Sequence, residues 1–393
     1  MLRAAIKAAG AWALYSTGSD RVVGAVRRVE QEPLVLCYHR VVHDLRRHTW
    51  SAPAMLVTQR TLAAQLDWVR RRYRFVALDE LAAAVESGPR QRRPLAAVTF
   101  DDGYADVYRN GLPVLTRMGI PATIFVVTDL IGTEGLQLHD RLHALLRQAN
   151  RRFGATGILS LLDRHRLEHP PWRHDSDWTP AQMTRLGEML LATQPRGALE
   201  HLASDLERYV AVPAEVADGL HALDWSMVRE LQKAGVVIGS HTRSHRVLPN
   251  ESAEDVHEEL AGSKRVLESK LGTEVRHFSF PNGHFSTATL RAVRAAGYDY
   301  AYSTCFHRDP EQRELTIPRR VFWERSLQGV SGRVSTAVAS CLVRGVFDRR
   351  SACPHDHGTT PAEASGSRVN PPDPHPPRSK PPGTPPVGEP VRS

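Results

Sequence analysis

The amino-acid sequence predicts an α/β fold built on a mostly parallel sheet, either open or closed into a barrel. Short apolar or β-branched runs recur along the chain, and each is followed by a turn or a polar cluster, as is typical of buried strands. Segments with the helical spacing of apolar residues lie between these runs. Because alternating strands and helices are joined by right-handed crossovers, we expect the strands to run parallel.

Seven runs have the length and composition of buried strands: 33–39, 95–103, 121–128, 235–241, 277–283, 298–304 and 315–323. Helices are expected over 61–72, 111–119, 225–235, 251–272 and 286–297. Four of these helical segments end at or next to a glycine, the residue that most easily takes the left-handed conformation of a helix end: Gly119, Gly235, Gly272 and Gly297. The regular alternation places most of residues 31–330 in one α/β domain.

Three segments depart from this alternation. Residues 132–222 are polar and rich in His, Arg and Leu, and they indicate helices without a strand, so we expect an α-helical insertion in a β/α connection. A C-terminal helix is expected over 331–350. Residues 351–393 are too proline-rich to pack and are expected to be a disordered tail, which could dock on a partner or serve as a solvated spacer.

The N-terminal residues 1–30 are basic and are expected to form an amphipathic segment. Lys7 interrupts their apolar patch, and the best uncharged run is too short to span a bilayer. Peripheral contact with a membrane and a degenerate signal peptide remain alternatives. Because no clear signal peptide is present, the expected location is cytoplasmic, with a membrane-peripheral or exported protein as the alternatives.

Composition narrows the function classes. At 393 residues with 41% hydrophobic content, the chain can bury a sizeable core. The formal charge of +8 comes from arginines scattered through the chain without a nucleic-acid-binding motif, so we expect no nucleic-acid partner. The four cysteines stand far apart with no CxxC spacing, which argues against a thiolate zinc site and favours reduced thiols.

Two adjacent carboxylates, Asp101 and Asp102, directly follow the apolar run 95–100. Like charges side by side at a strand end require either an open turn or a neighbouring cation. His241 and His245 follow another strand-like run with the spacing H-x3-H. This spacing alone is weak evidence, because it also occurs at 39/43, 139/143 and 165/169, and the last two pairs are expected to face solvent on helices.

The location of the two motifs at strand ends strengthens the case that they form one site. The carboxyl ends of parallel strands lie on one face of a β/α architecture, so the aspartates and the histidines can converge although about 140 residues separate them. Two imidazoles and one carboxylate form an open site for a divalent metal, and a second carboxylate beside it can accept a proton. The sequence therefore predicts a divalent-metal site with a proton-accepting carboxylate beside it, which would explain why two aspartates stand together.

These motifs resemble those of the polysaccharide deacetylases, carbohydrate esterase family four, which carry the NodB homology domain. The family's first motif, T-F-D-D-G, matches Thr99 to Gly103, and its second, H-[ST]-x-x-H, matches His241 to His245. The resemblance implies a distorted (β/α) barrel with fewer than eight strands and metal-dependent N-deacetylation of sugars. It also implies that Asp101 is the catalytic base and that Asp102, His241 and His245 hold the metal, which we expect to be Zn²⁺, with Co²⁺, Ni²⁺ or Mn²⁺ as alternatives.

The chain departs from the family pattern at the later motifs. The third motif commonly has an arginine ahead of P-Y, whereas this chain has Pro281-Asn282, whose backbone could still serve the oxyanion. The family's arginine that contacts the catalytic base is not evident in the sequence. Three residues are candidates for it: Arg276, Arg319 and Arg320. The L-x-H motif that supplies the general acid is not recognisable, so His39 becomes the candidate donor and His307 the weaker alternative.

Taken together, the residues and the resemblance predict a metal-dependent hydrolase that N-deacetylates an amino sugar in a glycan or lipid-linked glycan, in exopolysaccharide or cell-surface glycan modification. One alternative is a deacylase for another N-acyl sugar. The other is a non-catalytic glycan-binding or assembly module that keeps the metal for structure, which the incomplete later motifs favour. The presence of Asp101 opposes it, because a structural metal would not need a spare base.

Overall fold

The computed structural model describes residues 2–27, 33–87, 93–169, 178–305 and 308–348. All of these belong to one compact unit, Met1–Thr359, and a second unit, Thr360–Ser393, lies outside the described ranges. The predicted proline-rich tail, 351–393, therefore falls outside the described residues and stays a prediction.

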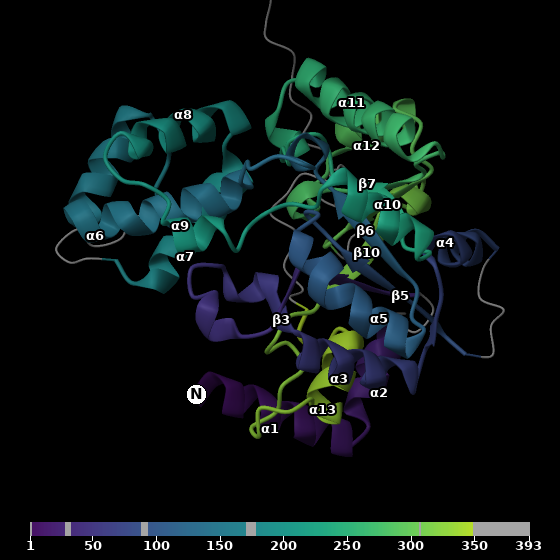
Figure 1. Cartoon of the computed structure of the whole chain (residues 1–393). Helices are drawn as coiled ribbons and strands as arrows, with labels where there is room; N and C mark the ends of the chain where they lie inside the picture. Colours follow the sequence, from purple (N-terminus) through teal and green to yellow (C-terminus); the bar gives the residue numbers. More distant parts are fainter. Residues whose placement is uncertain (1, 28–32, 88–92, 170–177, 306–307, 349–393) are drawn as a thin grey trace, which may run out of the picture. The chain divides into compact units, whose positions relative to one another are not determined.

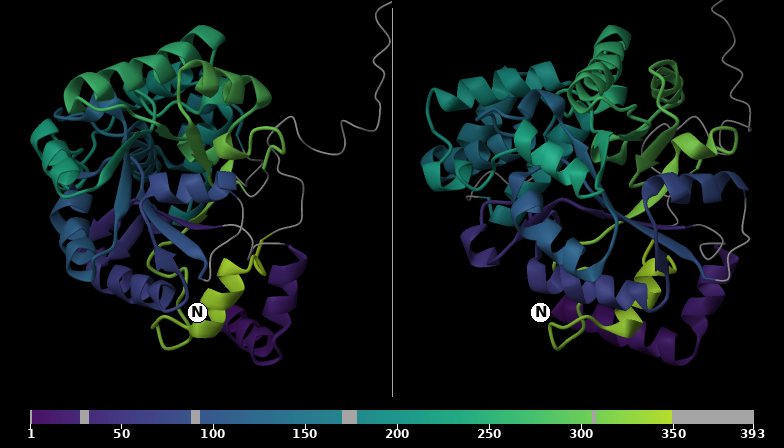
Figure 2. Two further views of the ribbon diagram at one scale, coloured as in Figure 1. Left: turned by 90° about the vertical axis from the view of Figure 1, so that its right-hand side faces the viewer. Right: turned by 45° about the vertical axis from the view of Figure 1, so that its right-hand side comes forward.

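A closed ring of parallel strands forms the centre of the compact unit (Figures 1 and 2). Its members are β1 (Leu34–Tyr38), β5 (Leu95–Phe100), β6 (Ala122–Val126), β7 (Val237–Ser240), β8 (His277–Ser279), β9 (Tyr300–Ser303) and β10 (Ile317–Val321). The order around the ring is β1-β10-β9-β8-β7-β6-β5, and pairing of β5 with β1 closes it. Each of these strands corresponds to one of the runs expected from the sequence. The predicted distorted (β/α) barrel is confirmed, with seven strands in the ring.

Amphipathic helices cover the outside of the ring, as Figures 1 and 2 show. They include α3 (Gln59–Arg70), α5 (Leu112–Met118), α10 (Trp225–Lys233), α11 (Ala253–Leu271) and α12 (Thr287–Ala295). Their buried faces join the outward-facing strand residues in the main hydrophobic core. Gly119 and Gly272 end α5 and α11 at φ 63° and 68°, a left-handed conformation that a side chain would strain.

Several short elements were not expected from the sequence. β2 (Arg40–Val42) pairs in parallel with β3 (Leu56–Thr58), and β4 (Arg74–Phe75) pairs with the first residues of β5. Helix α4 (Leu78–Ser87) follows β4. Strands of two or three residues give no measurable alternation of apolar and polar positions, so the sequence offered no signal for them.

Alternation along each strand divides the barrel into an inside and an outside. Val35, Ala97, Phe125, Tyr302 and Ile317 pack together in one cluster, whereas the chain neighbours of the first three belong to the outer core. Because successive side chains of a strand point to opposite faces, the first set fills the interior of the ring. The interior is therefore packed along this part of the barrel, and the next inward positions lie towards the carboxyl ends of the strands.

The insertion between β6 and β7 is helical, with α6 (Leu138–Arg164), α7 (Pro180–Thr193), α8 (Arg196–Glu207) and α9 (Ala214–Ala217). Its buried leucines form a hydrophobic cluster separate from the barrel core. Arg196 at the start of α8 hydrogen-bonds to Glu251 and to the backbone carbonyl of Ser244, which ties the insertion to the loop after β7.

The N-terminal segment forms two helices, α1 (Leu2–Ser16) and α2 (Ser19–Val26), and the C-terminal part of the described chain forms α13 (Thr336–Val343). Ala8 and Ala11 of α1 pack against Val338 and Cys341 of α13. Within the described ranges, no helix combines the length and the apolar character needed to cross a bilayer. The three cysteines in these ranges are free thiols.

Candidate active site

The sequence-predicted site residues meet at the carboxyl ends of the barrel strands. His39, Asp101 and His241 each lie two residues beyond an inward strand position, so the alternation of β1, β5 and β7 directs all three towards the barrel axis. Backbone hydrogen bonds fix two of them there, because the Asp101 amide donates to Tyr38 O at 2.9 Å and the His241 amide donates to Val126 O at 2.9 Å. The expected convergence of the two motifs is present.

The loops after β5 and β7 turn sharply to present the remaining two ligand candidates. Asp102 and His245 have positive φ angles of 71° and 62°, a conformation that is uncommon for residues other than glycine. Gly103, which follows Asp102, also has a positive φ, and its Cα faces the side chain of Val126 closely enough that a Cβ would crowd it. Backbone strain of this kind is typical of functional sites, where the surrounding structure holds it in place.

Asp102, His241 and His245 form a candidate metal site, because one ligand atom from each lies within 4.8 Å of the others. The Nε2 atoms of His241 and His245 are 3.7 Å and 3.3 Å from Asp102 Oδ1. His241 donates its Nδ1 proton to the backbone carbonyl of Ser279 at 2.7 Å, which leaves the Nε2 lone pair free to face the carboxylate. The three donors are therefore oriented as metal ligands.

The environment of the Asp102 carboxylate indicates that a cation fits the site formed with His241 and His245. Both carboxylate oxygens are buried and accept no hydrogen bond from any described residue. Burial, and then the adjacent Asp101 carboxylate, raise the pKa of Asp102 well above its ordinary value. A buried carboxylate without donors is costly, and a divalent ion shared with two neutral imidazoles satisfies both oxygens and restores the charged form.

Asp101 has a different environment from its neighbour. Arg319 of β10 donates two hydrogen bonds to it, at 2.7 Å to Oδ1 and 2.6 Å to Oδ2, and both side chains are buried. Burial alone would raise the pKa of Asp101, but the guanidinium outweighs it and holds the pKa below its ordinary value. Asp101 is therefore a fixed, ionised carboxylate beside the metal ligands, as a proton acceptor needs to be.

The structure shows which of the three candidate arginines contacts Asp101. Arg319 occupies an inward position of β10 and also bonds to Thr99 and Ser279. Arg320, the next residue, forms an ion pair with Asp348, and Arg276 pairs with Asp299. Of the three, only Arg319 contacts Asp101.

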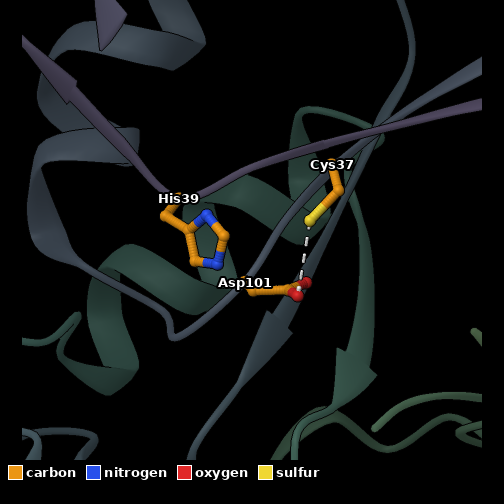
Figure 3. Close-up of side chains that lie close together, drawn as sticks. All are labelled: Cys37, His39 and Asp101. Atoms are coloured by element: carbon orange, nitrogen blue, oxygen red, sulfur yellow. Dashed lines mark hydrogen bonds between the residues drawn. The ribbon is translucent and has the colours of Figure 1, made fainter. Parts of the chain in front are cut away.

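Two residues of the first barrel strand and its end also lie beside Asp101: Cys37 of β1, and His39, which follows it (Figure 3). The Cys37 thiol donates to Asp101 Oδ2 at 3.6 Å, and the ring of His39 lies beside the carboxylate. Burial lowers the pKa of His39 to about 4, and its Nδ1 has no hydrogen-bond partner among the described residues. These three side chains could in principle hold a metal. Arg319 already occupies both Asp101 oxygens, and burial raises the pKa of the thiol, so the cluster is poorly suited to a cation.

The predicted oxyanion residues lie in the turn after β8, over Pro281–Gly283. Asn282 has a left-handed conformation with φ 56°, and its backbone N–H has no hydrogen-bond partner among the described residues. Gly283 cannot be replaced, because a Cβ there would lie 2.0 Å from Thr304 Oγ1. The turn is thus tightly packed against Thr304 and leaves the backbone N–H of Asn282 available as a donor.

The insertion adds a residue that the sequence-based interpretation missed. His139, near the start of α6, lies with its Nε2 atom 4.0 Å from Asp102 Oδ2 and its ring centroid 5.1 Å from that of His245. The expectation that the 139/143 pair faces solvent is wrong for His139, whose side chain is 15% exposed. Tyr104 donates to Asp140 at 2.5 Å and contacts His139 Nε2 at 2.8 Å, so the imidazole donates to the phenol oxygen.

A buried glutamate on α11 braces the loop that carries the histidines. Glu259 accepts hydrogen bonds at 2.9 Å from the backbone amides of Arg243 and Ser244 and at 2.7 Å from the Ser244 hydroxyl. These residues lie between His241 and His245. Since the carboxylate fixes the loop between the two ligands, Glu259 is a positioning residue for the metal site. The weaker general-acid candidate, His307, lies outside the described residues.

The chain resembles known proteins in sequence. The sequence pattern of the family described as "Polysaccharide deacetylase" matches residues 88–301. The protein YxkH of Bacillus subtilis is 19% identical over 271 residues, which cover 69% of this chain and 63% of YxkH. The poly-beta-1,6-N-acetyl-D-glucosamine N-deacetylase of Staphylococcus epidermidis is 33% identical over 78 residues, covering 20% of this chain and 27% of that protein. The chain thus spans less than two thirds of each of these relatives.

Among solved structures, IcaB from Ammonifex degensii aligns with a TM-score of 0.48 and 19% identity, over 80% of this chain and 97% of that one. The Streptococcus pyogenes deacetylase PplD aligns with a TM-score of 0.47 and 17% identity, over 73% of this chain and 91% of that one.

Proposed function

The chain belongs to the polysaccharide deacetylase family, and on this premise we propose that it is a metal-dependent hydrolase that removes acetyl groups from an N-acetylated amino sugar in a glycan or lipid-linked glycan. The observation that carries the proposal is the contrast between the two adjacent aspartates. Asp102 is buried without a hydrogen-bond donor beside two imidazoles, whereas Asp101 is held ionised by Arg319. One carboxylate is arranged to bind a cation and the other to accept a proton.

The metal would be held by Asp102, His241 and His245, and we propose Zn²⁺, which suits two imidazoles and one carboxylate. An ion bound there would make water a stronger nucleophile near neutral pH and polarise the substrate amide carbonyl. Asp101 accepts the proton of the attacking water, and Arg319 keeps the carboxylate ionised before that transfer.

The other polar groups of the site complete the hydrolysis. As the water oxygen bonds to the carbonyl carbon, the free N–H of Asn282 can donate to the developing oxyanion. The C–N bond then breaks, acetate forms, and the leaving amine takes a proton. His39 is the proposed donor: its imidazole is neutral at rest, receives from the neighbouring Asp101 the proton that Asp101 took from the water, and passes this proton to the amine (Figure 3).

Two further observations support catalysis over a purely structural metal site. The absence of a recognisable bracing arginine was one reason to consider a binding module, and Arg319 now supplies that contact. The orphan Nδ1 of His39 is a second polar atom that the fold leaves unpartnered in the site, as is expected of a group whose partner is a substrate.

For the substrate, we propose a polymer or lipid-linked chain of N-acetylated glucosamine, as in exopolysaccharide or cell-surface glycan modification. The matched relative from Staphylococcus epidermidis is named for such a polymer, which supports this choice. The same site chemistry would serve another N-acyl group, so the substrate panel has to include formamido sugars.

The test measures acetate release from N-acetylglucosamine oligomers and lipid-linked amino sugars by the wild type and by Asp101→Asn. We expect release from the wild type and a loss of at least about a hundredfold in the variant, because a general base contributes about 10²–10⁴ in rate. Asp299→Asn is the matched control, since this half-exposed aspartate pairs with Arg276 away from the site. Full activity in Asp101→Asn would refute the assigned mechanism.

A further inference from the structure

The outer faces of α1 and α2 carry an unusual concentration of exposed apolar side chains. We infer that this N-terminal apolar face, defined by Ile6, Trp12, Val22 and Val26, docks on the surface of a bilayer that contains anionic phospholipids. The inference concerns a surface away from the metal ligands and does not depend on the proposed deacetylation.

Exposed large apolar side chains are concentrated on α1 and α2. Eight large apolar side chains are exposed among the described residues, and five of them come from α1 and α2. Ile6 and Trp12 are 63% and 65% exposed, and Val22 and Val26 are 63% and 68% exposed. Scattered single apolar residues are normal on a protein surface, but a concentration on one short segment indicates an interaction site.

From residue 5 onwards, the exposed face of α1 contains no charge. The exposed positions in this stretch are Ile6, Ala9, Gly10, Trp12, Ala13, Tyr15 and Ser16. The one charged side chain in this stretch, Lys7, is drawn inwards, where its ammonium donates to the backbone carbonyl of Ser326 and lies 4.7 Å from the Phe347 ring centroid. A solvent-facing helix surface normally carries charged side chains, so this one is better suited to an apolar or interfacial environment.

This face is fixed by packing on the opposite side of the helices, so its exposure is not a consequence of an unattached segment. Ala8 and Ala11 bury the inner side of α1 against Val338 and Cys341 of α13. Asp20 anchors α2, because it is fully buried and accepts hydrogen bonds from Ser340 and Arg344. The apolar side chains of both helices are therefore held outward by contacts that a binding partner would not need to break.

The charges of this segment favour an anionic membrane as the partner. The one acidic residue of 2–27 is the buried Asp20, whereas Lys7 is turned inwards and Arg27 is paired with Asp348. Arg21 is exposed beside Val22 on α2. An apolar centre with a tryptophan, an exposed arginine beside it and no exposed acid complements the acyl boundary and the headgroups of anionic lipids.

The length of α1 favours contact along the surface. Its 15 residues extend about 22 Å, which is shorter than the roughly 30 Å hydrocarbon core of a bilayer. A helix of this length whose inner face is already packed against α13 can lie in the interface with its outer face towards the acyl chains. Trp12, which is 65% exposed, would then insert among the headgroups.

Vesicle flotation of the full-length protein tests the inference. We expect the wild type to float with vesicles of phosphatidylglycerol mixed with phosphatidylcholine, less with phosphatidylcholine alone, and less again when salt is raised. The double variant Ile6→Glu and Trp12→Glu should lower partitioning by about a hundredfold, about tenfold per apolar side chain removed from the interface. Both positions are exposed, so these changes should leave the fold intact.

Two further variants serve as checks. Val22→Glu with Val26→Glu examines the same face from α2 and should lower partitioning in the same direction. Tyr209→Glu changes an exposed aromatic residue of the insertion, 40% exposed, and should float as the wild type does. Partitioning that is equal in the wild type and both double variants would overturn the inference. So would a wild type that stays unbound to the anionic vesicles but self-associates through this face, as measured by light scattering.

Discussion

Replacement of Arg319 by methionine should change the activity, the pH profile and the stability in a linked way. The guanidinium donates two hydrogen bonds to Asp101 and one each to Thr99 and Ser279, all within the buried barrel. Removing one partner of a buried ion pair costs about 3–5 kcal/mol of stability, because the other charge is left without compensation. We expect a loss of this size in the free energy of unfolding near pH 7.

The pH dependence follows from the direction of the pKa shift. In the wild type the pKa of Asp101 lies below its ordinary value, so the stabilisation is complete above the ordinary carboxyl pKa and is lost as the pH falls through the lower folded value. Without Arg319, burial is no longer outweighed, and the pKa of Asp101 should rise. The acidic limb of kcat/KM should therefore move to higher pH, with activity reduced about a hundredfold or more at neutral pH.

The assay combines acetate release across pH with urea unfolding. Arg320→Met is the matched control, because the adjacent arginine pairs with Asp348 outside the site and its loss should leave the acidic limb unchanged. Arg319→Lys keeps a charge without the bidentate geometry and provides a second variant if the methionine protein is too unstable to assay. An acidic limb that stays in place in both Arg319 variants would refute the role assigned to this arginine.

Three further changes test other parts of the site. His241→Ala should abolish stoichiometric metal binding, as measured by elemental analysis, since it removes one of three ligand donors. Glu259→Gln should weaken metal affinity by about 10–100-fold in a chelator competition titration, whereas Glu254→Gln, at an exposed position of the same helix, should leave it unchanged. His139→Ala should lower kcat/KM by about tenfold with metal content retained, because its Nε2 is engaged by Tyr104; a loss of the metal would contradict this assignment.

Much of the fold could be predicted because the barrel strands are fully buried and read as continuous apolar runs. The convergence of Asp101 with His241 followed from the rule that parallel strands end on one face. The sequence could not select Arg319 over Arg320, because that choice depends on which residues of β10 point inwards. Only the register of β10 against β1, with Val35 opposite Arg319, settles it.

His139 was missed for a different reason. Its spacing to His143 is the ordinary spacing of helix neighbours, and nothing in the composition of the insertion showed which helix face would meet the barrel. The position of His139 in the chain did indicate that it could lie near the site. The insertion begins after the carboxyl end of β6, so its first residues had to leave from the face that holds the metal ligands.

The most direct test of the central claim is acetate release from N-acetylglucosamine oligomers by protein that has been stripped of metal with a chelator and then reloaded with Zn²⁺. We expect the stripped protein to lose activity and the reloaded protein to regain it, with about one ion bound per chain. Reloaded His241→Ala should regain neither the ion nor the activity. Acetate release that is unchanged by stripping would contradict a metal centre built from Asp102, His241 and His245.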